Sequence, residues 1–115
     1  MRRLDRVRIL SESDKRLMFE LKSVIARFVP HATVVLYGSA ARGKRGPESD
    51  YDVLILLDAP MARRTREEMR SAIYDLELER GVVMSIMVTT RDEWNSPLHS
   101  VSPYHRNVES TGVLL

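Results

Sequence analysis

Two aspartates, Asp50 and Asp52, stand at the start of a strongly apolar stretch. Residues 53–57 are apolar throughout, which is typical of a central strand covered on both faces. Residues two apart in a strand point to the same side, so both carboxylates would converge while Tyr51 points away. Mg²⁺ commonly takes one or two protein carboxylates and completes its octahedron with water and substrate phosphates. The pair predicts a Mg²⁺ site, although an exposed strand start with Asp50 capping a turn explains it equally well.

A glycine and a serine, Gly38 and Ser39, follow a second apolar stretch, residues 34–37. The glycine would let backbone amides approach a phosphate, and a helix starting at Ala40 would add free N–H groups and a positive field. The Ser39 hydroxyl can donate to a phosphate oxygen. Taken alone, a tight turn with Ser39 as N-cap is the better explanation. Adjacent strands lie about 5 Å apart, so this turn and the aspartates can lie at the same end of the sheet. Phosphoryl and nucleotidyl transfer require such a phosphate-binding group next to a metal site.

Together these features resemble a known signature. Gly38-Ser39, ten intervening residues and then Asp50-Tyr51-Asp52 are similar to the motif of the polymerase-β-like nucleotidyltransferase superfamily. The surrounding strings, residues 36–43 and 49–54, look like those of the minimal nucleotidyltransferases of bacteria and archaea. The motif is specific because it combines spacing, strand context and residue chemistry. The resemblance implies a nucleotidyltransferase fold of the polymerase-β-like palm type.

The resemblance also implies roles for individual residues. Gly38 and Ser39 would hold the triphosphate, and Asp50 and Asp52 would ligate Mg²⁺ and serve in catalysis. Arg42 would stand near the phosphates, although an exposed arginine at a helix end explains it as well. Small members of the family are typically paired with a separate helical HEPN-type protein, in two-component or toxin–antitoxin systems. The implied partners are therefore a nucleoside triphosphate and such a protein.

One carboxylate expected of active family members is missing. These members usually carry a third acid on a later strand, which completes the site for the ion that activates the nucleophile. The later strand here, residues 82–88, contains no acid, and Ser85 occupies roughly the expected place. Glu77, Glu79 and Asp92 flank that strand and are better explained as solvated surface charges.

Two functions follow from the pattern and the resemblance. The first is an enzyme that binds Mg-ATP and transfers AMP to a hydroxyl acceptor on a partner protein, for example a tyrosine. The second is a catalytically impaired nucleotide-binding adaptor or antitoxin that neutralises a HEPN-type partner by contact. Modification of tRNA or of an antibiotic is the weaker explanation, because the chain leaves no room for a substrate-binding domain.

The periodicity of the chain predicts one α/β domain over residues 1–115, with a small mixed sheet flanked by helices. The expected elements are a helix from Ser11 or Ser13 to about Val29, a strand at 34–37, a short helix from Ala40, a loop at 43–49, a strand at 50–57, a helix from the Thr65 capping box to Gly81, a strand at 82–89, a short helix after Thr90 and another at 103–110. The apolar residues 113–115 need a neighbour, either a sheet edge or another subunit.

The composition narrows the class of protein. The 115 residues include no cysteine, which excludes disulfides and thiolate chemistry. No stretch resembles a membrane span or a secretory signal, so we expect a cytoplasmic protein without membrane contact. The net charge of +2 is small and no aromatic residues interleave the arginines, so nucleic-acid binding is not expected. A homodimer or a hetero-complex is compatible with the apolar tail.

The positions of several other side chains in the sequence indicate structural rather than chemical roles. The histidines His31, His99 and His105 are scattered without metal-ligand spacing, which indicates surface or helix-end positions. Trp94 follows a helix cap and is expected to pack on the sheet. Tyr74 and Leu78 lie off the main apolar stripe of their helix, where partial burial is expected and a partner-facing patch is the alternative.

Overall fold

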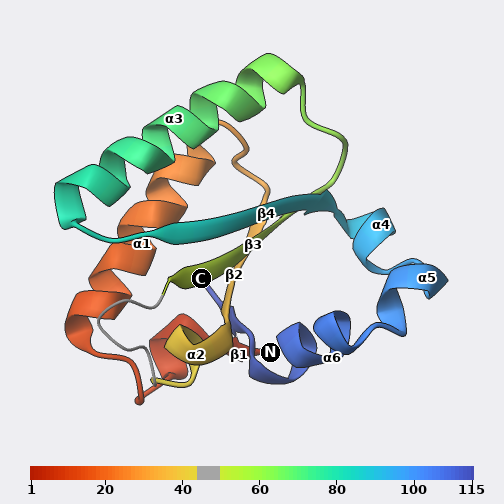
Figure 1. Cartoon of the computed structure of the whole chain (residues 1–115), viewed down its shortest axis with the longest axis horizontal. Coiled ribbons are helices and arrows are strands. Elements are labelled where there is room, and N and C mark those ends of the chain that lie inside the picture. The colour runs from red at the N-terminus through yellow and green to blue at the C-terminus, as the bar shows by residue number, and fades with distance from the viewer. Residues whose placement is uncertain (44–49) are drawn as a thin grey trace.

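The computed structural model of the chain describes residues 1–43 and 50–115 and shows a mixed sheet with helices packed against it (Figure 1). Five strands follow the order β1-β5-β2-β3-β4. The β3–β4 and β1–β5 pairs are parallel, and β2 is antiparallel to both of its neighbours. The predicted α/β class and small mixed sheet are confirmed. The elements are β1 (Arg2–Arg3), the 3₁₀ helix η1 (Leu4–Arg6), α1 (Glu12–Ala26), β2 (Thr33–Tyr37), α2 (Gly38–Ala41), β3 (Tyr51–Leu57), α3 (Arg63–Arg80), β4 (Met84–Thr90), α4 (Arg91–Trp94), α5 (Pro97–Ser100), α6 (Pro103–Thr111) and β5 (Val113–Leu114).

The central strand is β3, between β2 and β4, as its apolar sequence predicts. Its residues 53–57 are all buried. One face of the sheet packs against α1 and α3, which lie side by side (Figure 1). Each large apolar side chain buried there stabilises the fold by roughly 1.5–3 kcal/mol. The side chains of the two helices in this core are Leu17, Met18, Leu21, Ile25, Met69, Ile73 and Leu76.

The two long helices start and stop for local reasons. The Ser11 side chain caps α1 by accepting a hydrogen bond from the Asp14 amide at 3.0 Å. The expected cap of α3 at Thr65 is wrong, because α3 begins at Arg63 after Ala62, which makes no side-chain cap. Arginine–glutamate pairs one helical turn apart favour this earlier start, and they join Arg63 to Glu67 at 3.1 Å and Arg64 to Glu68 at 3.3 Å. Gly81 ends α3 in a left-handed conformation, as predicted.

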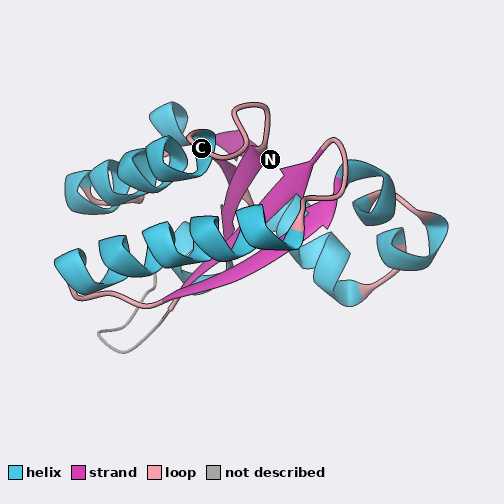
Figure 2. Ribbon diagram, turned by 90° about the horizontal axis from the view of Figure 1, so that it is seen from above, coloured by secondary structure: helices cyan, strands magenta, loops and turns pink. Residues whose placement is uncertain are grey.

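The C-terminal segment covers part of the other face of the sheet. Thr90 caps α4 by accepting a hydrogen bond from the Glu93 amide at 3.1 Å, as its sequence predicts. The apolar tail joins the sheet as β5, where Leu114 pairs with Val35 of β2. Both ends of the chain therefore lie close together, on the adjacent strands β1 and β5 (Figure 2).

A second, smaller core lies beneath the C-terminal helices and is formed by Val35, Leu54, Leu56, Trp94 and Val108. The helices leave part of this face uncovered, since Ser85 and Met87 of β4 are exposed. This uncovered area, with the starts of β3 and β4, is called the open face below. In the part of the chain that the structure describes, no helix is both long and apolar enough to cross a membrane.

Candidate nucleotide-binding site

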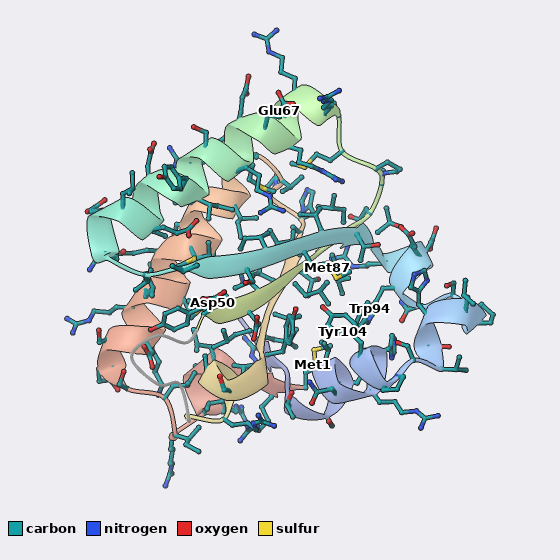
Figure 3. The ribbon with its side chains drawn as sticks, viewed as in Figure 1. Met1, Asp50, Glu67, Met87, Trp94 and Tyr104 are labelled. Atoms are coloured by element: carbon teal, nitrogen blue, oxygen red, sulfur yellow. The ribbon has the colours of Figure 1, made fainter. Side chains whose placement is uncertain are left out.

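The two aspartates share the open face at the start of β3, where Figure 3 labels Asp50. Asp52 is in register with Tyr37 of β2 and with Ser85 of β4. The Ser85 hydroxyl donates a hydrogen bond of 2.8 Å to Asp50 Oδ2, which places Asp50 on the side of the sheet where Ser85 lies. Tyr51 points the other way, into the main core, and donates to Asp14 Oδ1 at 2.5 Å. The alternation expected from their two-residue spacing is thus observed.

The bend at Gly38 lies directly against the Asp52 carboxylate. Gly38 has a φ of 75°, a left-handed conformation that glycine adopts without steric cost. A β-carbon built on Gly38 would lie only 2.5 Å from Asp52 Oδ2. A side chain at this position would strain the backbone and force the Asp52 carboxylate to move. The glycine therefore allows a carboxylate and the backbone of the bend to approach one another closely.

The other two predicted phosphate-binding residues lie on α2. This helix begins at Gly38, with Tyr37 at the N-cap position. Ser39 therefore lies inside the helix, and the alternative in which it caps a helix starting at Ala40 is wrong. Ser39 is half-buried beside Gly38. Arg42 is exposed at the far end of α2 and makes no ion pair with the described residues. The structure thus brings Gly38, Asp50 and Asp52 together and does not bring the Arg42 guanidinium into contact with the carboxylates.

The electrostatics of the pair suit a divalent cation. Partial burial raises the pKa of Asp52 above its ordinary value, and the negative charge of Asp50 raises it further. Two carboxylates that repel one another present hard oxygen ligands to a cation, whose charge would offset the repulsion. The donor set therefore fits Mg²⁺, with Asp50 and Asp52 as the residues that would hold it.

Among the described residues, no third acid lies on this face. Ser85 is the register partner of Asp52 on β4 and holds Asp50 by its hydroxyl, so it stands at the place predicted for the missing carboxylate. Among residues 1–43 and 50–115, no three acidic or histidine side chains are grouped as metal ligands. Glu77 has a different role, since its Oε2 accepts a hydrogen bond from the Met84 amide at 3.1 Å and ties α3 to the start of β4.

Two tyrosines and a methionine on the open face were not predicted from the sequence. The Tyr104 hydroxyl donates to the Tyr37 hydroxyl at 2.8 Å and lies 3.2 Å from Met87 Sδ. Burial raises the pKa of Tyr104, and Tyr37 and the charge of Asp52 raise it further, so this hydroxyl stays neutral. Tyr37 could have been placed from its alternation with the buried Val35. Nothing in the sequence indicates that Tyr104 of α6 reaches it.

One of the expectations for other side chains needs correction. Trp94 is buried on the sheet as predicted, and His105 lies in the first turn of α6, as the predicted helix-end position allows, with its side chain 12% exposed. The His105 ring stacks on Trp94, with 4.3 Å between the ring centroids. A Glu109 carboxylate oxygen accepts a hydrogen bond of 3.1 Å from the Trp94 indole Nε1. Tyr74 and Leu78 are 57% and 64% exposed rather than partly buried, because α3 turns only its Met69, Ile73 and Leu76 stripe inward.

A larger groove lies on the other side of the sheet. It has a volume of about 660 Å³ and is formed by α1, β2 and β5, with Lys15, Phe19 and Lys22 among its lining residues. Neither the aspartates nor the Gly38 bend contribute to it. We therefore place the chemistry on the open face, where the carboxylates and the glycine meet.

Comparison with known proteins decides the family. A family model described as "Nucleotidyltransferase domain" matches residues 19–109, which include the Gly38 bend and both aspartates. The chain belongs to the nucleotidyltransferase domain family. Members of this family generally use Mg²⁺ and a nucleoside triphosphate, which agrees with the carboxylate pair found here.

One curated relative supports the narrower assignment of this nucleotidyltransferase to the minimal nucleotidyltransferases. It is "Probable protein adenylyltransferase MntA" of Haemophilus influenzae (strain ATCC 51907 / DSM 11121 / KW20 / Rd), 25% identical over 91 residues. The match covers 79% of this chain and 80% of the relative. The predicted membership of the minimal nucleotidyltransferase family is confirmed.

A solved structure shares the fold of this nucleotidyltransferase. It is titled "Crystal structure of the toxin-antitoxin with AMP-PNP", and the two chains superpose with a TM-score of 0.52 at 18% identity. The superposition covers 86% of this chain and 69% of the other. The similarity supports the mixed sheet flanked by helices as a nucleotidyltransferase-like fold.

Proposed function

We propose that this nucleotidyltransferase binds Mg-ATP on the open face and transfers AMP to a hydroxyl group of a partner protein. The hydroxyl oxygen forms a bond to the α-phosphorus, the bond from that phosphorus to the bridging oxygen breaks, and pyrophosphate and the hydroxyl proton are released. The observation that carries the proposal is the contact between the Gly38 bend and the Asp52 carboxylate. It brings a backbone suited to phosphates and a carboxylate pair suited to Mg²⁺ to one place. Nucleotidyl transfer needs both, because charge on the phosphates must be neutralised while the acceptor attacks.

Each residue of the site has a distinct part in this proposal. Asp50 and Asp52 hold Mg²⁺, which when bound neutralises and orients the triphosphate. The Gly38 backbone lies along the phosphates, and the Ser39 hydroxyl donates a hydrogen bond to a phosphate oxygen. Arg42 adds positive charge near the phosphates from the end of α2. Ser85 keeps Asp50 turned toward Asp52 through its hydrogen bond of 2.8 Å.

The acceptor is proposed to lie on a separate helical HEPN-type protein. The described residues form one sheet with its helices, and the site proposed on its open face accounts for the nucleotide and the metal ion but not for the acceptor. The relative is named a protein adenylyltransferase, and the solved neighbour comes from a toxin–antitoxin structure, which supports a protein partner. The chain would then act as one domain, alone or as a homodimer, in the cytoplasm, where Mg-ATP is available.

A second candidate is a nucleotide-dependent antitoxin that blocks its partner by contact without transferring AMP. Ser85 favours this alternative, because it occupies the register position where a third acid would activate the nucleophile. In that case the carboxylates would still bind Mg-ATP, and the nucleotide would serve only to order the protein.

Labelling separates the two candidates. The chain is incubated with α-labelled ATP, millimolar Mg²⁺ and a HEPN-type partner, and label on the partner is measured. Transfer that disappears in Asp52→Ala, and persists in the control Glu79→Ala on the exposed side of α3, supports the enzyme. Binding of ATP without transfer supports the antitoxin. Failure to bind Mg-ATP at all rejects both.

A further inference from the structure

A small hollow lies on the same side of the sheet as the carboxylate pair, farther along β4. It has a volume of about 180 Å³ and lies between the second half of β4 and helices α4 to α6, where Figure 3 shows Met87, Trp94 and Tyr104 grouped together. Those three side chains form its apolar and aromatic wall, and Thr89, Glu93 and Ser102 provide polar groups. Sites that enclose whole drug-sized ligands measure roughly 300–1,000 Å³. This hollow therefore suits a single flat ring system.

The position of the hollow relative to the carboxylates follows from the strand geometry. Met87 and Thr89 lie two and four residues beyond Ser85 on the same face of β4, and Ser85 is in register with Asp52. At about 3.3 Å per residue, they stand roughly 7 and 13 Å along the sheet from the level of the carboxylates. A nucleotide whose phosphates lie at the Gly38 bend would extend its ribose and base over this distance. Tyr104 connects the two sites, because its hydroxyl bonds Tyr37, the other register partner of Asp52.

The polar edge of the hollow presents a hydrogen-bond acceptor. Glu93 Oε2 accepts a hydrogen bond of 2.9 Å from the Thr89 hydroxyl, which orients the carboxylate at the side of the hollow. An ionised carboxylate can only accept hydrogen bonds. An exocyclic amino group, as in adenine, would donate to it. The carbonyl oxygen that guanine carries at the equivalent position would face it as a second acceptor and be repelled.

We propose that this hollow is the base-binding site of the nucleotidyltransferase and that Glu93 selects adenine over guanine by accepting a hydrogen bond from its exocyclic amino group. The base stacks against the side chains of Met87 and Tyr104, and the Glu93 carboxylate accepts a hydrogen bond from the amino group at the edge of the base. This inference rests on the proposed function, because the bound phosphates set the distance to the base.

The test compares ATP, GTP and inorganic tripolyphosphate, each with Mg²⁺, by calorimetry on the full chain. Wild type should bind ATP at least about tenfold more tightly than GTP, because a base in the hollow would cover the Glu93 carboxylate, which is exposed without a ligand, and the carbonyl oxygen of guanine would leave that carboxylate unpaired. Glu93→Gln, which can donate to a carbonyl oxygen, should reduce that ratio to about threefold or less. Glutamine also preserves the capping position at the start of α4, so the fold is retained. Asp92→Asn, an exposed acid of the same helix that does not line the hollow, should leave the ratio unchanged.

Tripolyphosphate separates failure of this inference from failure of the proposed function. It has no base, so its affinity should depend on Asp52 and be the same in wild type and Glu93→Gln. If tripolyphosphate and ATP bind but wild type does not distinguish ATP from GTP, the base site is overturned and the phosphate site stands. The same holds if Glu93→Gln leaves the ratio unaltered. If neither ligand binds, the proposed function and this inference both fail.

Discussion

Gly38 and Asp52 lie so close together that a β-carbon on the glycine would stand 2.5 Å from the carboxylate oxygen Oδ2. Asp52 lies on β3, and Gly38 begins α2 directly after Tyr37, which is the last residue of the antiparallel strand β2 and the register partner of Asp52. The register of β2 and β3 thus sets the distance between the proposed phosphate-binding and metal-binding groups. A change at either residue is expected to disturb the other.

Gly38→Ala should abolish Mg-ATP binding and destabilise the protein. The added methyl group must displace Asp52, and alanine at a φ of 75° costs about 1–2 kcal/mol. Calorimetry of nucleotide binding and thermal unfolding would measure the two effects. Gly81→Ala is a matched control, because Gly81 also has a positive φ, of 66°, but a β-carbon there would meet nothing within 4 Å.

The control should lower stability by a similar amount and leave Mg-ATP binding intact. Equal loss of binding in both variants would show that backbone strain, rather than the contact with Asp52, is responsible. Unchanged binding in Gly38→Ala would refute the proposed role of this contact.

Asp52→Asn should stabilise the metal-free protein at neutral pH. The pKa of Asp52 is raised above its ordinary 3.8 in the folded state, so folding favours the protonated carboxyl, and that contribution is lost as the pH rises through the folded pKa. The charged form is therefore unfavourable at neutral pH, and asparagine removes it. Because solvent screens part of the repulsion, we expect a gain of a few degrees at most in Tm, measured in EDTA.

This stabilisation should fade in acid, since wild-type Asp52 is itself protonated well below pH 3.8. An equal gain at neutral and acidic pH would contradict the electrostatic explanation. Asp58→Asn, an exposed carboxylate paired with Arg91 at the other end of β3, should give no such gain.

Asp50→Asn should lower the pKa of Asp52 toward its ordinary value without restoring it fully. The charge of Asp50 is the second cause of the raised pKa, and burial, the larger cause, remains. A pH titration of the Asp52 carboxyl by NMR in EDTA would measure the shift. No change in that pKa would mean that the two carboxylates do not interact, which would weaken the case for a shared cation.

The parts of this site that could be predicted depend on local sequence. Alternation along β3 places Asp50 and Asp52 together, and the chemistry of Gly38 marks the bend. Ser85 was connected to the site by the family resemblance, which expects a third acid on the later strand, and the parallel pairing of β3 with β4 places it in register with Asp52.

The contacts that escaped prediction join distant parts of the chain. Tyr104 lies 67 residues from Tyr37, and their contact depends on how three short helices fold back over the sheet. The stacking of His105 on Trp94 depends on the same folding of the short helices. The wrong prediction that Thr65 caps α3 has a local cause. Two arginine–glutamate pairs favour a helix that begins before the capping box at Thr65.

The Tyr37–Tyr104 contact should couple the two residues energetically. A hydrogen bond of this kind contributes about 0.5–1.5 kcal/mol to stability. In a double-mutant cycle of Tyr37→Phe and Tyr104→Phe, urea unfolding should give a coupling free energy in that range. Strictly additive effects would show that the 2.8 Å contact contributes no net stability.

Ser85→Asp should increase AMP transfer if the missing third acid limits catalysis. The new carboxylate would stand in register with Asp52, where a further metal ligand is expected, and would replace the hydroxyl that bonds Asp50. We expect at least about a tenfold gain in the rate of label transfer from α-labelled ATP, equal to about 1.4 kcal/mol.

In EDTA the same variant should unfold at lower temperature, because three carboxylates then repel one another without a cation. Ser85→Ala removes only the hydrogen bond to Asp50, so it should give no gain. If Ser85→Asp transfers AMP no faster than wild type, the third acid is not what limits the reaction.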